Sequence, residues 1–302
     1  MRISTTWFHQ LGVNEMLQRQ SKLSESQLKL STGQKYLKPS ENPQAATALI
    51  DFNQRIKVYE QYQDNIVTVR QRLEQAASGI DTGVNILQRV RELTVQGLND
   101  TNSGANRRQI AEEIDQLNGV LHSIANTQNP NGEFIFSGFA SDRPAFSAAP
   151  GFAYNGDGNQ RGITIGPNRT VADGDPGQAV FGVVALPPTA PGSIDNVFQA
   201  LQRLADDFRS NVANPQSLAD IDRALDRFTS VSVSLGARLN AIDAQQTLNE
   251  GYIIEHKAIA SQIGDLDYAE AISQFNLQEI ALQAAQQSFA RIQNLSLFNF
   301  LR

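Results

Sequence analysis

The stretch from Asn42 to Leu98 constrains the fold more than any other part of the sequence. Apolar or small residues recur there every seven positions in two neighbouring rows: Tyr59, Ile66, Leu73, Ile80, Leu87 and Thr94, and Tyr62, Val69, Ala76, Gly83, Val90 and Gly97. Two heptad rows sustained over about six heptads are typical of a coiled coil. Asn42 and Pro43 are residues that commonly start a helix. At 1.5 Å per residue the helix would be about 80 Å long, so it needs a partner of similar length to cover its stripe.

A second heptad run supplies this partner. It starts after Asn214-Pro215, continues to about Ile263, and has Leu218, Leu225, Ser232 and Leu239 beside Ile221, Phe228, Leu235 and Ile242. Gln246 and Asn249 are polar where the repeat calls for apolar residues. Near residues 264–267 the frame slips by about one position, which we interpret as the joint between two stacked helical layers.

The middle of the chain has a different composition. An amphipathic helix is expected over residues 105–127 and another from residue 193, which leads up to the Asn214-Pro215 break. Between them, four short β-like pieces are separated by turn residues, at 134–136, 152–154, 162–165 and 179–184. About fifty residues bury little core by themselves, so we expect a β-rich appendage whose removal leaves the helices folded.

The two ends of the chain are expected to form helices that associate with each other. Residues 1–40 carry six basic and two acidic residues, and residues 264–302 carry two basic and four acidic ones. The N-terminal row of Met16, Leu23, Leu30 and Leu37 runs beside glutamines, whereas the C-terminal end has a stripe of Phe275, Leu282 and Phe289 with Ala285 and Ile292 beside it. Such helices are marginal alone in water. We therefore expect both ends to be disordered in the monomer and buried between copies of the chain.

These patterns predict a mainly α fold. Both chain termini would build a long antiparallel coiled-coil or helical-bundle rod, with a small β-rich domain appended in the middle. The expected division is a terminal helical assembly domain (1–41 and 264–302), a helical rod domain (42–139 and 193–263) and an outer domain (140–192).

Composition excludes several classes of protein. The net charge is −6 and the pI about 5.2, which argues against nucleic acid as the main partner. The absence of cysteine excludes disulfides and thiolate metal sites. The N-terminus lacks the apolar core of a cleavable signal, and no run reaches the ~20 apolar residues of a membrane span.

An enzyme is the competing class, and the sequence gives it little support. His9, His122 and His256 are far apart and lie in expected helices, where a surface or core role is commoner than catalysis. The segment 156–162 has the wrong spacing for a phosphate loop, and a calcium loop starting at Asn155 lacks the required sixth and twelfth residues. We therefore expect no catalytic, cofactor or metal site. A helical adhesin or translocator remains a third class.

Several motifs resemble those of the flagellin superfamily. They are MRIST at the start, LSTGQK at 30–35, PSENPQAA at 39–46, LGARLN at 235–240, DLDYAEA at 265–271 and LSLFNFL at 295–301. The run NGEFIFSG at 131–138, followed by RPAF at 143–146, is similar to the FlgL-type, hook-associated branch. The segment Gln34–Leu37 departs from the pattern typical of filament flagellins, although a filament subunit stays the alternative.

The resemblance implies a structural subunit at the hook–filament junction. Its expected partners are other copies of itself, the upstream junction protein, filament flagellin and an export chaperone. Export would proceed without a cleaved signal, to the extracellular flagellum. The expected subunit interface comprises Trp7, Met16, Leu23, Leu30, Leu37, Phe275, Leu282, Ala285, Phe289, Ile292, Leu297, Phe298 and Phe300.

Overall fold

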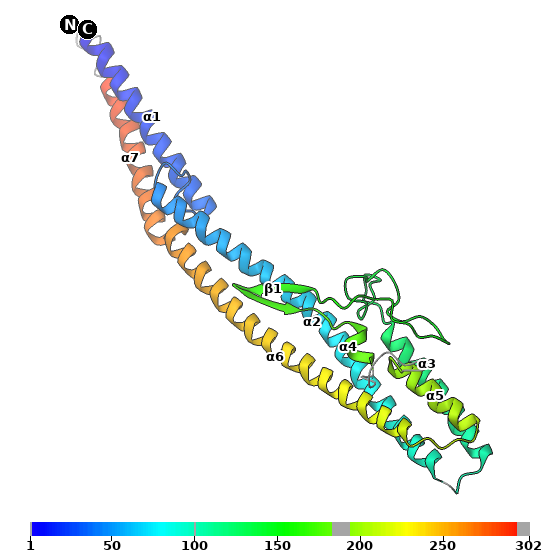
Figure 1. Cartoon of the computed structure of the whole chain (residues 1–302). Coiled ribbons are helices and arrows are strands. Elements are labelled where there is room, and N and C mark those ends of the chain that lie inside the picture. Colours follow the sequence, from blue (N-terminus) through cyan, green and yellow to red (C-terminus); the bar gives the residue numbers. More distant parts are fainter. Residues whose placement is uncertain (1, 100, 183–193, 295–302) are drawn as a thin grey trace. The chain divides into compact units, whose positions relative to one another are not determined.

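The computed structural model describes residues 2–99, 101–182 and 194–294, and it confirms a mainly α fold with a small sheet (Figure 1). In chain order the elements are α1 (Arg2–Thr32), α2 (Pro43–Leu98), α3 (Gly104–Ala125), β1 (Gly162–Gly166), β2 (Arg169–Ala172), α4 (Gly177–Phe181), α5 (Val197–Arg209), α6 (Gln216–Gly264) and α7 (Tyr268–Asn294). The last two residues of the β-like piece expected at 179–184 lie outside the described residues.

The helix starts follow from local side-chain caps. The side chain of Asn42 accepts a hydrogen bond from the backbone N–H of Ala45, and Pro43 is the first residue of α2. Asn214 accepts from Gln216 N at the start of α6, and Asp267 accepts from Ala269 N at the start of α7. These side chains satisfy backbone donors that a helix leaves unpaired in its first turn. The starts of both long helices and the break near residue 265 are thus as predicted.

The chain divides into two compact units. We call residues 1–58 and 251–302 the terminal unit, and residues 59–250 the middle unit. This division differs from the expected three domains, because the boundaries fall inside α2 and α6 and residues 140–192 belong to the middle unit.

In the middle unit, α2 and α6 are the antiparallel partners that the heptads predict. The ion pairs and hydrogen bonds between them join residues whose numbers rise along one helix and fall along the other: Arg70 with Asp243, Asp81 with Ser232, and Arg91 with Asp222. Between the helices, Ile66, Leu73, Ile80 and Leu87 are fully buried. The glycines of the heptad rows make room for rings, since Gly83 faces Phe228 and Gly97 faces Phe208.

The segment between α3 and α5 is part of this core and is no appendage. Its Phe146, Phe152, Ile165, Val171 and Phe181 belong to the same buried cluster as the residues of α2 and α6. The ring of Phe181 lies 5.3 Å from that of Phe228 on α6, edge to face. The segment therefore supplies apolar surface that the long helices need, which the sequence-based expectation missed.

The β structure is smaller than predicted. The piece at 162–165 forms β1, paired antiparallel with β2. Residues 134–136 and 152–154 form only isolated bridges, Gln128 with Phe134 and Phe146 with Tyr154. The strand expected at 179–184 is wrong for its described part, because α4 begins directly after Pro176 and includes Val180 and Phe181.

The hairpin explains a polar position in the heptad pattern. Asn249 is fully buried and donates a hydrogen bond to the carbonyl of Ile165 at 2.9 Å, and Asn65 on α2 donates to that of Thr164 at 2.8 Å. Polar side chains thus bind the strand backbone to both long helices, where apolar side chains would leave these carbonyls unpaired.

A candidate assembly surface in the terminal unit

Within the terminal unit, α1 packs against α7 (Figure 1). Met16, Leu23 and Leu30 on α1 are half-buried, as are Phe275, Leu282, Ala285 and Phe289 on α7. The two predicted rows are therefore brought together in a single chain, and each stays partly exposed. Leu37 is half-buried in the segment after α1. The side chain of Ile292, together with Leu297, Phe298 and Phe300, lies outside the described residues.

A close helix contact is possible because Gly12 faces Phe289. A Cβ atom at Gly12 would lie 2.8 Å from Cδ2 of this ring, and the ring of His9 lies 5.1 Å from it, edge to face. Farther along, the hydroxyl of Ser26 donates to Oε1 of Gln278 at 2.8 Å.

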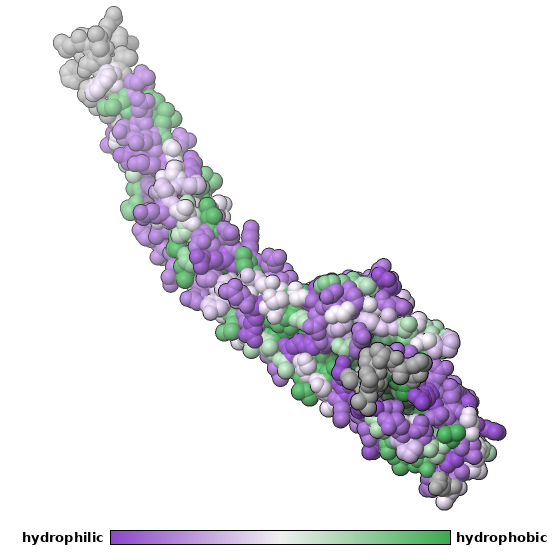
Figure 2. Space-filling view, viewed as in Figure 1, coloured by the Kyte–Doolittle hydropathy of each residue, from purple (hydrophilic) through white to green (hydrophobic). Residues whose placement is uncertain are grey.

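The terminal unit has almost no buried core of its own. Among its described residues, only Ala45 and Ile56 are buried apolar side chains, whereas the core cluster comes entirely from the middle unit. Twelve large apolar or aromatic side chains of the terminal unit are exposed: Trp7, Leu11, Leu17, Leu28, Ile50, Val58, Tyr252, Ile254, Tyr268, Ile272, Leu277 and Ile280. Apolar patches are visible along the α1–α7 pair in Figure 2.

Both terminal helices therefore have two apolar faces. On α7, Phe289 lies against Gly12 of α1 and shares a seven-residue row with the half-buried Phe275 and Leu282, while Leu277 and Ile280 are 65% and 63% exposed. On α1, Leu17 and Leu28 are 59% and 55% exposed. We call Leu11, Leu17, Leu28, Leu277 and Ile280 the outward residues. Sequence reasoning missed them because it followed only one stripe on each helix, although their helical spacing was there to read.

Charge is distributed unequally between the units. The terminal unit holds eleven Lys and Arg residues against nine Asp and Glu, and the middle unit holds fourteen against twenty-two. Their formal net charges are therefore +2 and −8. A unit that is close to neutral and apolar on its surface favours association, whereas strong net charge opposes it.

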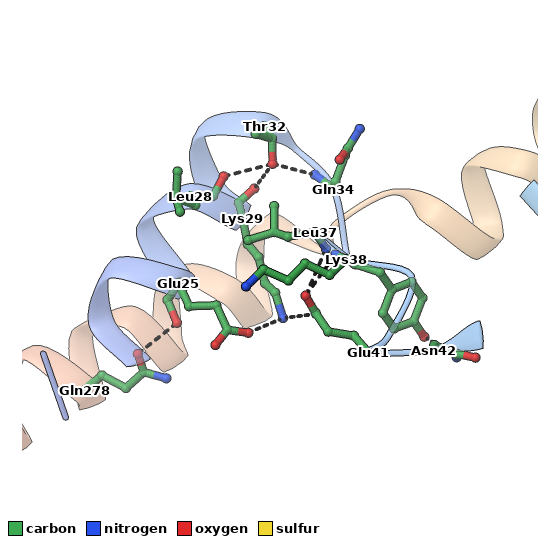
Figure 3. A network of polar contacts seen from close by, with 12 residues as sticks. Glu25, Leu28, Lys29, Thr32, Gln34, Leu37, Lys38, Glu41, Asn42 and Gln278 are labelled. Carbon is green, nitrogen blue, oxygen red and sulfur yellow. Dashed lines mark hydrogen bonds and ion pairs between the residues drawn. The ribbon is translucent and has the colours of Figure 1, made fainter. Parts of the chain in front are cut away.

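Polar contacts fix the segment between α1 and α2, residues 33–42 (Figure 3). Lys35 N donates to the carbonyl of Gly264 at 2.8 Å, and Leu266 N donates to that of Gly33 at 2.9 Å. Lys29 forms ion pairs with Glu25 at 3.0 Å and with Glu41 at 2.9 Å. A groove of about 510 Å³ lies beside these residues.

The described parts of the chain contain neither a candidate metal-binding group nor a candidate membrane-spanning helix. No group of three or more His, Cys, Asp or Glu side chains there is placed to hold a metal ion. No helix among these residues is long and apolar enough to cross a membrane. The ring of His122 packs edge to face on Phe152 and Phe198, and that of His256 lies 5.7 Å from Phe52, as expected for histidines that contribute to packing.

Comparison with known proteins agrees with this arrangement. Residues 3–141 match the bacterial flagellin N-terminal helical region, and residues 218–301 match the bacterial flagellin C-terminal helical region. Flagellar hook-associated protein 3 of Escherichia coli K12 is 25% identical over 99% of this chain and 99% of its own length. The Salmonella typhimurium protein of the same name is 25% identical over the whole of both chains.

A solved structure shows the same fold. The flagellar hook-associated protein 3 of Legionella pneumophila superposes with a TM-score of 0.63 at 22% identity, covering 70% of this chain and 98% of that one. The paired terminal helices, the family matches at both ends and the full-length similarity all agree. The chain therefore belongs to the flagellin superfamily, in the branch of the flagellar hook-associated protein 3 proteins.

Proposed function

We propose that this chain is a structural subunit of the bacterial flagellum that forms the hook–filament junction. Copies would assemble into a short helical ring that joins the upstream junction protein to the flagellin filament. The supporting observation is the terminal unit, whose described residues include two buried apolar side chains and twelve large exposed ones. A globular unit with so little core gains stability by associating.

Other copies of the chain would cover the outward residues and the exposed parts of the α1–α7 stripe. Each fully buried Leu or Ile contributes roughly 1.5–3 kcal/mol, so a few such contacts per subunit offset a large part of the entropy lost on association. Apolar residues lie on opposite sides of the α1–α7 pair, so one face can meet a different face of the next copy. Contacts of this heterologous kind produce rings or helical assemblies.

The expected interface residues fit this proposal as members of one helical pair. Met16, Leu23, Leu30, Phe275, Leu282, Ala285 and Phe289 would set the α1–α7 pair and complete their burial on assembly, together with Trp7, Leu37, Ile292, Leu297, Phe298 and Phe300. The middle unit, with its net charge of −8, would face solvent and remain soluble.

The remaining partners follow from the family. We propose that an export chaperone holds the chain before assembly, and that the flagellar export channel carries it out with its N-terminus uncleaved. Mass spectrometry of secreted protein should then find residues 2–20 intact. A larger N-terminal loss would exclude this route.

Assembly can be tested by placing a charge on an outward residue. Ile280→Asp should prevent ring formation with the purified upstream protein, seen by negative-stain microscopy, and cells that carry it should shed flagellin into the medium. Val233→Asp is a matched control, because Val233 is 69% exposed on α6 in the middle unit. Assembly through the terminal unit would be refuted if Ile280→Asp formed normal rings, or if Ile280→Asp and Val233→Asp reduced ring formation equally.

Filament flagellin remains the alternative function, and the same assay separates the two. A filament subunit would polymerise into long tubes on flagellin seeds without the upstream protein. The proposed junction subunit would stop at short rings and would require it.

A further inference from the structure

The segment between α1 and α2, residues 33–42, has no regular structure and no buried side chain. It turns at Gly33, whose φ of +69° is in the left-handed region, and its backbone N–H there donates to the carbonyl of Lys29 at 2.9 Å. Such a glycine is a common helix end. Because no side chain of this segment is buried, polar contacts must set the direction of α1 relative to the start of α2.

Glu41 makes the most extensive of these contacts. Its Oε1 accepts hydrogen bonds from the backbone N–H groups of Leu37 at 3.2 Å and Lys38 at 3.1 Å. Its Oε2 pairs with Nζ of Lys29 on the last turns of α1 at 2.9 Å. One carboxylate therefore fixes the loop with one oxygen and the helix with the other, as Figure 3 shows.

The length of the side chain matters for this double contact. Aspartate is one methylene shorter, so we expect it to make the loop contacts and the Lys29 contact together less well than Glu41 does. The side chains of Lys29 and Glu41 are 23% and 25% exposed, respectively, which shields the pair partly from solvent.

We propose that Glu41 is a positioning residue for assembly, which aligns α1 with α7 by linking the end of α1 to the start of α2 through Lys29. This inference rests on the proposed function, because the alignment matters only if the α1–α7 pair is the assembling surface. Lys29 and Glu41 both line the groove of about 510 Å³, so the link is not enclosed by other side chains.

The charged states of both groups agree with this assignment. The hydrogen bond and charge of Lys29 lower the pKa of Glu41 below its ordinary 4.5, and the hydrogen bond that Lys29 donates to Glu41 raises the pKa of Lys29 above 10.5. Each group thus widens the pH range over which the other stays charged, on the acidic side for Glu41 and on the basic side for Lys29.

The experiment is hydrogen exchange on the free, full-length chain. Glu41→Gln and Lys29→Met should each accelerate exchange of the amides of residues 33–38 and of Leu266, roughly three- to tenfold, as expected for loss of one or two charge-assisted hydrogen bonds. Glu41→Asp should give a smaller increase. In the wild type this protection should fall with added salt, whereas in the variants it should depend little on salt.

Controls separate positioning from general destabilisation. Glu25→Gln removes the other acidic partner of Lys29, which lies on α1 itself, and should leave residues 33–38 close to wild type. Exchange in the middle unit should not change in any variant. Unchanged exchange of residues 33–38 in both Glu41→Gln and Lys29→Met would overturn the proposal.

Failure here is distinguishable from failure of the proposed function, because the exchange is measured without assembly. If wild-type protein formed no rings, the proposed function would fail, whereas the exchange result would still decide whether Glu41 links the helices. If both hold, Glu41→Gln should also raise the protein concentration needed for rings several-fold.

Discussion

Replacing Gly83 by alanine tests the packing of the middle unit most directly. Alanine favours the helix, which raises stability, but its methyl group would crowd the ring of Phe228, which lowers stability. Alanine stabilises a helix interior by about 1 kcal/mol relative to glycine. At Gly83, however, the added Cβ would enter the ring of Phe228, with Cδ1 only 3.0 Å away, and would lie 3.3 Å from Cδ1 of Leu121. Carbon atoms pack at about 3.5–4.0 Å.

The ring cannot move away easily. Phe228 is fully buried, and the ring of Phe181 lies 5.3 Å from it, edge to face. Overpacking of such a site costs about 1–3 kcal/mol, and more where backbone must shift. We therefore expect Gly83→Ala to destabilise the protein by up to about 2 kcal/mol once the helical gain of about 1 kcal/mol is subtracted from the packing cost.

Gly119 on α3 provides the matched control. It lies inside a helix, and a Cβ built there would meet nothing within 4 Å. Gly119→Ala should therefore stabilise by up to about 1 kcal/mol. For a unit of this size each kcal/mol shifts Tm by roughly 2–4 °C, so the two alanine variants should melt on opposite sides of the wild type.

Calorimetry and circular dichroism on the full chain measure both shifts. Adding Phe228→Leu should remove most of the extra cost of Gly83→Ala, since leucine frees the space that the methyl group needs, and a double-mutant cycle reports the coupling. If Gly83→Ala stabilised the protein as much as Gly119→Ala, this would refute the close contact between Gly83 on α2 and Phe228 on α6.

Three further changes test other parts of the structure. Leu282→Asp should disturb the α1–α7 pair, leave the melting of the middle unit almost unchanged and prevent incorporation at the junction; normal incorporation would argue against a role for this stripe. Deleting residues 141–191 with a Gly-Ser join should remove Phe146, Phe152 and Phe181 from the core, so helicity and cooperative melting should both fall, and a fully helical product would restore the appendage interpretation. On acidification, the stabilising effect of Glu41 should be present above pH 4.5 and be lost as the pH falls through its lowered pKa. Exchange of residues 33–38, corrected for intrinsic rates, should then accelerate in the wild type and change much less in Glu41→Gln, which has no carboxylate to protonate.

Much of the fold was predictable because its signals are local. Asn42 and Asn214 cap helices through hydrogen bonds to residues two or three positions away, so they act wherever the rest of the chain lies. The seven-residue rows likewise specify a helix and the face that needs covering. The slip near Gly264 predicted the end of α6 for the same reason.

Other predictions failed where the deciding contacts are distant in sequence. Residues 179–184 contain β-branched residues that favour a strand, but Pro176 begins a short helix that carries Phe181 into contact with Phe136, Phe146, Phe198 and Phe228. Turn-rich composition similarly suggested an appendage, because it gives no sign of which apolar residues the long helices would share.

The sequence by itself therefore determined where the two long helices begin, that they pair, and that both chain ends are amphipathic. The tertiary structure alone decided that Gly83 receives Phe228, that the middle segment completes the core, and that α1 and α7 keep a second apolar face exposed. The physical reason is that caps and periodicity act within one or two helical turns. Burial, in contrast, depends on which distant surfaces meet, and a pattern on one helix does not identify the surface that covers it.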